Sequence, residues 1–127
     1  MRLRRPILNT LAAVAVAAAT LATSLPTLAQ TAFPSRPVRM VVNFPPGGAA
    51  DLIARAVAAP LSDSFGQPVV VENRAGANGN LGGEAVARSA ADGYTVLLSS
   101  GGMVSVNPHI YPKMSFDPVR ELMPVAS

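Results

Sequence analysis

Short apolar runs alternate along residues 38–99 with segments whose apolar residues recur at helical spacing. Residues 38–44 are almost continuously apolar, which is typical of a strand that is covered on both faces. The segment after the next glycines has apolar residues at i, i+3, i+4 and i+8, the stripe of an amphipathic helix: Ile53, Ala56, Val57 and Leu61. We therefore predict a strand, followed by a helix that starts near Ala50 and is closed by Gly66.

The same alternation then repeats. Residues 69–72 predict a second strand, residues 82–90 a helix of small residues, and residues 95–99 a third strand. Strands that alternate with helices in this order form parallel sheets with right-handed crossovers. The sequence therefore predicts an α/β fold with a βαβαβ start, in which ligands bind at the loops that follow the strands.

Three further features affect this prediction. Pro60 lies inside the predicted first helix and should kink or break it. Residues 107–112 indicate a loop, which the Asn107 side chain would tie down through bonds to the backbone, and Asp117 before a proline predicts a short turn. Residues 123–127 resemble the beginning of another strand, which suggests that the chain is a fragment.

The N-terminus has the three parts of a secretory signal peptide. Three arginines give a positive start, residues 11–19 form an apolar run, and Pro26 precedes a small-x-small pattern that ends at Ala29. A membrane anchor is the alternative, but a span needs about 20 strongly apolar residues and this stretch is mostly alanine. We predict cleavage after Ala29, which leaves residues 30–127 outside the cytoplasm and without stable membrane insertion. The export route stays open.

Removing the leader also removes the excess of positive charge. The whole sequence has ten Lys and Arg against seven Asp and Glu, and three of the ten lie in the leader, so the mature part has seven of each sign. Nucleic acids and anionic membrane surfaces require clustered positive charge, so we expect neither as a partner. The chain has no cysteine, which excludes disulfide bonds, thiolate metal sites and a cysteine nucleophile.

The strongest local motif is Phe44-Pro-Pro-Gly-Gly-Ala-Ala-Asp51, at the junction of the first strand and the first helix. Its glycines let the backbone approach a ligand, and the unpaired N–H groups of a helix start suit a carboxylate or another small anion. A tight turn in which Asp51 merely caps its own helix explains the same residues equally well. The glycine spacing matches neither a phosphate loop nor a dinucleotide motif, so we expect no nucleotide cofactor.

The segment after the third strand offers hydroxyl groups and backbone amides to the same ligand: Ser99, Ser100, Gly101 and Gly102. An ordinary polar loop is the alternative. No G-x-S-x-G motif surrounds either serine, so we expect no catalytic nucleophile there. His109 is the single histidine of the chain and has no second histidine or clustered carboxylates near it in sequence, which argues against a metal site.

Six motifs occur in an order that gives the sequence a specific resemblance. They are Pro34-Ser-Arg-Pro37-Val-Arg, Phe44-Pro-Pro-Gly-Gly-Ala-Ala-Asp51, Gly66-Gln-Pro-Val-Val-Val-Glu-Asn-Arg74-Ala-Gly76, Asp92-Gly-Tyr-Thr-Val-Leu-Leu98, Asn107-Pro-His-Ile-Tyr111 and Phe116-Asp-Pro118. The series resembles the opening of the tripartite tricarboxylate transporter substrate-binding family, also called Bug or TctC proteins. The resemblance covers nearly all of residues 34–126.

This resemblance implies a periplasmic binding protein of type II, in which two α/β domains joined by a hinge close on a small carboxylate without catalysis or cofactor. Residues 30–127 would be the N-terminal part of the first domain. By motif, a ligand carboxylate would contact the backbone of the loop after the first strand at Gly47, Gly48, Ala49, Ala50 and Asp51, and residues 99–102 would face the same cleft. Asn43 departs from the family, which more often has proline there, and it adds an amide before the loop.

The leading hypothesis is therefore a periplasmic protein that delivers a di- or tricarboxylate, or a related acid, to membrane transporter subunits. A sensor that presents its ligand to a signalling partner would have the same sequence features. A third hypothesis is an exported α/β enzyme whose catalytic residues lie beyond Ser127.

Overall fold

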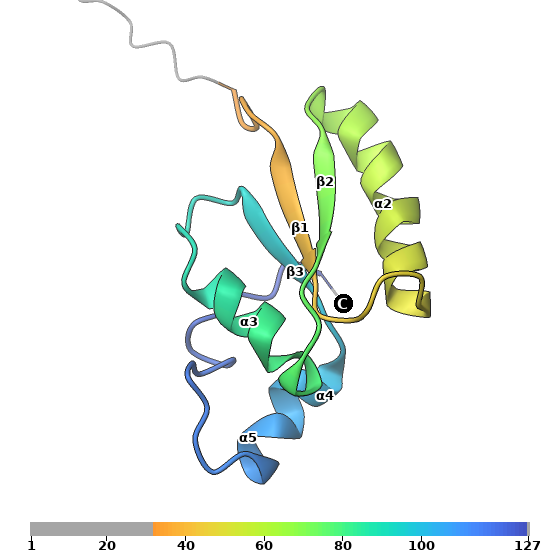
Figure 1. The fold of residues 1–127 in the computed structure, drawn as a ribbon. Coiled ribbons are helices and arrows are strands. Elements are labelled where there is room, and N and C mark those ends of the chain that lie inside the picture. The colour runs from red at the N-terminus through yellow and green to blue at the C-terminus, as the bar shows by residue number, and fades with distance from the viewer. Residues whose placement is uncertain (1–31, 127) are drawn as a thin grey trace, which may run out of the picture. The chain divides into compact units, whose positions relative to one another are not determined.

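Three parallel strands form the centre of the structure, a computed structural model that describes residues 32–126 (Figure 1). β1 (Val38–Val42) lies between β2 (Val69–Asn73) and β3 (Thr95–Leu98), in the order β2-β1-β3. The predicted α/β class and the βαβαβ order are confirmed. The signal peptide predicted for residues 1–29 lies outside the described residues.

β1 is the buried strand of the sheet because it has a bonded neighbour on each side. Val41 and Val42 have no exposed surface. Val42 pairs with Asn73 of β2 and with Leu98 of β3, so the three strands end at one edge. This central place explains the almost unbroken apolar run of the first predicted strand.

α2 (Ala49–Phe65) and α3 (Asn80–Ala87) cover opposite faces of the sheet (Figure 1). α2 packs on β1 and β2, whereas α3 packs on β1 and β3. The chain crosses from β1 to β2 in one direction and then returns past β1 to β3. Right-handed crossovers in opposite directions place the two helices on opposite faces, so β1 receives a helix on each. No helix within residues 32–126 is both long and apolar enough to span a bilayer.

The buried face of α2 differs from the predicted one. Ala54 and Ala58 are buried against the sheet, whereas Ile53 is 57% exposed and Val57 is 41% exposed. The prediction was wrong for these two residues, although Leu61 of the same stripe packs against the core. Because α2 is apolar on most sides, periodicity alone does not select one face. The alanine face packs on the sheet because its small side chains let the helix backbone come close.

Of the kink or break predicted at Pro60, the break does not occur, since α2 continues through it to Phe65. Pro60 and Ala56 both lie on the exposed side, where water reaches the carbonyl that proline leaves without an N–H partner. The last turn is fastened instead by Ser62, whose Oγ donates to the Ala58 carbonyl at 2.7 Å and accepts from the Val69 amide at 2.8 Å. Gly66 closes α2 with a left-handed φ of 62°, as predicted.

The remaining elements are short. A 3₁₀ turn, η1 (Ala77–Gly79), precedes α3, which is shifted toward the N-terminus relative to the predicted helix of residues 82–90. After β3 lies α4 (Gly101–Ser105). The loop predicted for residues 107–112 instead begins with α5 (Asn107–Ile110), because a proline at the second position of this helix is compatible with a first helical turn.

Beyond α5, the turn predicted at Asp117 is confirmed, with its Oδ1 accepting from the Val119 and Arg120 amides at 2.9 and 3.2 Å. Residues 123–126 form no strand, contrary to prediction. The apolar composition of this segment does not suffice for a strand without a neighbour to pair with, and the described sheet ends at β3.

The amino edge of the sheet is held by a cluster around Tyr94, which directly precedes β3. The Ser35 amide donates to the Tyr94 hydroxyl at 2.9 Å, and the Phe33 ring meets the Tyr94 ring edge-on at 4.9 Å. The Arg36 guanidinium lies 4.0 Å from the centre of the same ring and 2.8 Å from Asp92. This cluster fastens the segment before β1 to the turn before β3.

Candidate ligand-binding site

The opposite, carboxyl edge is the edge at which parallel α/β sheets generally bind ligands, beside the strand where the strand order reverses direction, which is β1 in this sheet. Three segments leave the sheet at this edge: residues 43–48 after β1, 74–79 after β2 and 99–100 after β3. Figure 1 shows them at the end of the sheet where α4 lies. The first segment is the start of the predicted ligand loop.

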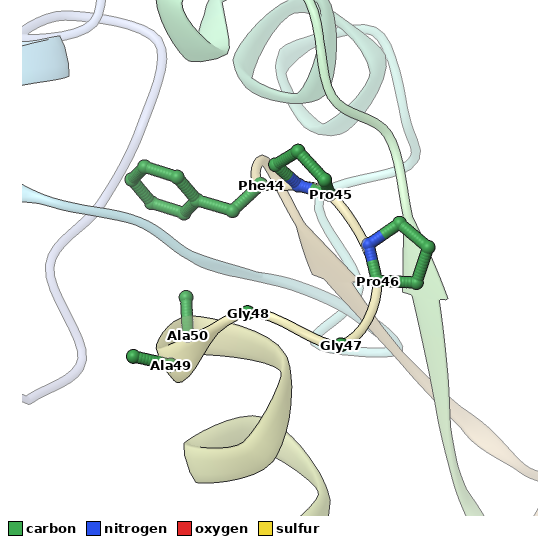
Figure 2. A pocket seen from close by; sticks show the side chains of 7 residues that line it. All are labelled: Phe44, Pro45, Pro46, Gly47, Gly48, Ala49 and Ala50. Atoms are coloured by element: carbon green, nitrogen blue, oxygen red, sulfur yellow. The ribbon is translucent and has the colours of Figure 1, made fainter.

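The loop between β1 and α2 borders an open pocket of about 500 Å³. Its lining residues are Phe44, Pro45, Pro46, Gly47, Gly48, Ala49 and Ala50. In Figure 2 the Phe44 ring lies across the pocket from Ala49 and Ala50. Phe44 and Ala50 also pack on core residues of β1 and α2, so the pocket wall is continuous with the core. Neither Asp51 nor the segment of residues 99–102 is part of this wall.

The start of α2 leaves backbone donors open beside the pocket. Gly48 is the N-cap and makes no side-chain bond to the first turn. The N–H groups of the first turn, which begins at Ala49, have no carbonyl one turn earlier in the helix, so they suit an anion. Gly47 turns the chain toward them with a φ of 79°, a conformation that favours glycine.

Asp51 is buried in the first turn of α2, with 4% of its surface exposed. Its Oδ2 accepts hydrogen bonds from the Gly47 amide at 2.9 Å and from Arg55 Nε at 3.1 Å, and its Oδ1 lies 3.0 Å from a second Arg55 nitrogen. The Arg55 hydrogen bond, followed by those from Gly47 and Asn73, lowers the pKa of Asp51 from 3.8 to about 2. These contacts support the interpretation in which Asp51 holds its own helix start.

Asn73 shapes the loop and was not among the predicted site residues, whereas Arg55 was expected from its place four residues after Asp51. Asn73 ends β2, and its Nδ2 donates to the Phe44 carbonyl at 3.2 Å and to Asp51 Oδ1 at 3.0 Å. Arg55 in turn donates to Asn73 Oδ1 at 3.4 Å. The available signal was the position of Asn73, a polar residue at the carboxyl end of a parallel strand.

The segment after β3 reaches the first loop through Asn43. Asn43 Nδ2 donates to Ser99 Oγ at 2.7 Å and to the Gly79 carbonyl at 3.3 Å. Ser100 is the N-cap of α4, and Gly101 and Gly102 form its first turn. The structure therefore brings Ser99 beside the ligand loop, while the next three predicted residues open a short helix instead of a polar loop.

Asn107 has the tethering role that was predicted for it. It is fully buried, its Nδ2 donates to the Asn78 carbonyl at 3.0 Å and to Asn80 Oδ1 at 2.6 Å, and its Oδ1 accepts from Asn78 Nδ2 at 2.7 Å. These bonds tie α5 to the start of α3. His109, on the same short helix, is exposed, and no cluster of His, Asp and Glu suited to a metal ion occurs within residues 32–126.

With this geometry established, comparison with known proteins decides the family. Residues 53–127 match the family described as the tripartite tricarboxylate transporter family receptor, TctC. The chain belongs to this family. The resemblance found in the motifs is thereby confirmed, and TctC proteins are transport receptors, not enzymes.

Individual relatives support the assignment to the TctC family. Protein BugT of Bordetella pertussis is 47% identical over 91% of this chain and 36% of its own length. A structure from R. palustris with adipate is 41% identical with a TM-score of 0.65, over 68% of this chain and 29% of that one. MatC from Rhodopseudomonas palustris with bound malate is 36% identical with a TM-score of 0.66, over 70% and 30%. The chain thus has the fold of the periplasmic binding proteins over about a third of their length.

Proposed function

We propose that this chain is the N-terminal part of the first domain of a periplasmic solute-binding protein, which captures a small carboxylate and delivers it to a tripartite-type membrane transporter. The observation that carries the proposal is the start of α2, whose first-turn N–H groups are uncapped by any side chain and open beside a pocket of about 500 Å³. Relatives that were solved with malate and adipate support a dicarboxylate as the ligand class.

The charge balance at the loop favours this class of ligand. A bare Asp51 carboxylate in the first turn would repel a second carboxylate, but Arg55 neutralises it through two contacts of about 3 Å. The positive end of the helix dipole and the free N–H groups then act on the ligand. Within the site, Gly48, Ala49 and Ala50 would contact the ligand through their backbone N–H groups. The Gly47 N–H donates to Asp51 instead, and this bond would hold the loop in place.

A single backbone donor can be removed to test this. Ala49 is the first residue of α2, a position that accepts proline, and Gly48 already has the extended conformation (φ −83°, ψ 173°) that a residue before proline prefers. Ala49→Pro should therefore keep the fold and remove one N–H group. Because a hydrogen bond to a charged group contributes about 1.5–3 kcal/mol, we expect the dissociation constant to rise roughly 10- to 150-fold.

The measurement is isothermal titration of malate and adipate into the protein expressed at the full length of its gene. Ala49→Ser retains the N–H group and serves as the matched control, with an affinity within about threefold of the wild type. The uncharged diamides of the two acids serve as ligand controls and should not bind. Wild-type affinity in Ala49→Pro, or equal binding of the diamides, would contradict carboxylate capture at this helix start.

A further inference from the structure

Asn43 is a buried amide that joins all three segments at the carboxyl edge of the sheet. It follows β1 directly and is 2% exposed. Its Nδ2 donates to Ser99 Oγ, after β3, at 2.7 Å and to the Gly79 carbonyl, between β2 and α3, at 3.3 Å. Both N–H groups of the amide are thus engaged.

The orientation of this amide is fixed by its neighbours. The Gly79 carbonyl can only accept hydrogen bonds, so the nitrogen of the Asn43 amide must face it. Two glycines also close around the side chain, because a Cβ at Gly79 would lie 2.4 Å from Asn43 Nδ2 and one at Gly82 would lie 2.6 Å from Asn43 Cβ. The amide is therefore held with its donors toward Gly79 and Ser99.

The oxygen of the Asn43 amide, unlike its nitrogen, makes no hydrogen bond to the neighbouring segments. Asn43 Oδ1 is buried and has no hydrogen-bond donor among the described residues. A buried acceptor without a donor costs stability. The contacts that favour asparagine at this position are therefore those of its two N–H groups, to Gly79 and to Ser99.

The donation from Asn43 determines what the Ser99 hydroxyl can do. A serine hydroxyl has one proton to donate and lone pairs that accept. The Asn43 amide donates to one lone pair of Ser99 Oγ, so the Ser99 hydroxyl proton must point elsewhere. Its acceptor in the structure is the Ser100 carbonyl, at 3.4 Å from Ser99 Oγ. This distance exceeds the usual range of about 2.5–3.0 Å for an O–H···O bond. The proton is free to move to a better acceptor, and the bond from Asn43 strengthens it as a donor.

We infer that Asn43 is a positioning residue, which makes Ser99 a donor to an oxygen of a ligand that extends beyond the pocket wall of residues 44–50 to the end of β3. This inference rests on the proposed function and deepens it. The Asn43–Ser99 pair selects ligands that present an acceptor oxygen at this point, such as an ionised carboxylate or a carbonyl. A ligand that presents an ammonium group there finds no acceptor in Ser99.

We call the action of Asn43 on the ligand through the Ser99 hydroxyl the relay. A double-mutant cycle tests it, with titration of malate and adipate into the full-length protein. Removal of the donor in Ser99→Ala should raise the dissociation constant roughly 10- to 100-fold, and Asn43→Ala should raise it about 3- to 10-fold. In the Ser99→Ala background, however, Asn43→Ala should change it less than about twofold, because the residue acts through the missing hydroxyl. Ser99→Thr, which keeps the hydroxyl, should restore affinity to within about threefold of the wild type.

Ser105 supplies the control, since its exposed hydroxyl bonds to the Gly101 carbonyl within α4, and Ser105→Ala should bind as the wild type does. If Asn43→Ala does not fold, Asn43→Leu takes its place, because leucine fills a similar volume without the amide and keeps the backbone N–H that donates to the Leu98 carbonyl at 3.4 Å. Equal weakening by the Asn43 variant with and without the Ser99 hydroxyl would overturn the relay and leave carboxylate binding intact. Failure of the wild-type protein to bind either acid would instead overturn the proposed function, and the relay with it.

Discussion

Replacing Gly82 with alanine measures how closely α3 approaches the sheet. In an ordinary helix interior, alanine is favoured over glycine by about 1 kcal/mol. Here the added Cβ would lie 2.6 Å from Asn43 Cβ, 3.0 Å from Asn43 Cα and 3.0 Å from the Arg74 carbonyl oxygen. Two of these three atoms belong to the backbone, so no side-chain rotation relieves the contact and α3 has to move away from β1.

The two effects oppose each other, and the steric one should win. Overpacking a core costs about 1–3 kcal/mol, and a contact with backbone atoms of two segments belongs to the upper part of that range. After subtraction of the gain in helix propensity, we expect a net loss of about 1–2 kcal/mol in the free energy of unfolding. Urea unfolding of the full-length protein, followed by far-ultraviolet circular dichroism, provides the measurement.

Gly101→Ala is the matched control, because it also lies in a helix but a Cβ there has no neighbour within 4 Å. It should change the free energy of unfolding by less than about 1 kcal/mol, and in the stabilising direction. If Gly82→Ala were as stable as the wild type, α3 would not pack against Asn43 as closely as described. The fixed orientation of the Asn43 amide would then lose its basis.

Three further predictions concern other contacts. Because the pKa of Asp51 falls from 3.8 to about 2 on folding, its contribution to stability is complete above about pH 4 and is lost as the pH falls toward 2. Asp51→Asn should therefore flatten the melting temperature over this pH window, and an unchanged slope would contradict the ion pair with Arg55. Asn107→Ala leaves the buried side chains of the tether unpaired and should lower the free energy of unfolding in urea by about 1–3 kcal/mol, whereas the exposed His109→Ala should change it by less than about 0.5 kcal/mol. Tyr94→Phe keeps the ring contacts but removes the hydroxyl that accepts from Ser35, so amide hydrogen exchange at Ser35 should accelerate while exchange in β1 does not change.

The strands and their common edge follow from the sequence because their signals are local. The apolar run before Phe44 and the glycines after it mark the end of β1, and the alternation of strands with helices implies a parallel sheet. The face of α2 does not follow in the same way. Ala54 and Ala58 are less hydrophobic than neighbours such as Ile53, so the apolar pattern favoured the larger side chains. Only the close packing of the helix on the sheet favours the smaller ones.

In the candidate site, too, local features could be predicted from the sequence and long-range contacts could not. The loop of residues 44–51 is contiguous and carries its own motif, so its place between β1 and α2 was predictable. The contacts of Asn73 and Asn43 were not predictable, because their partners lie far away in the chain: Asn73 meets Asp51 across 22 positions and Asn43 meets Ser99 across 56. Such contacts depend on strand register, which a single sequence specifies only through the fold as a whole.

The cluster around Tyr94 has a practical consequence for handling the protein. It fastens residues 33–36 at one end of the sheet, and the ligand loop lies at the other end, about 16 Å away for a strand of five residues. A cysteine introduced at Ala32 would be the single thiol of this chain, which has none of its own. A tether attached there would direct the carboxyl edge of the sheet away from a solid support, so the fold is suited to oriented immobilisation in a surface-based test of the proposed ligands.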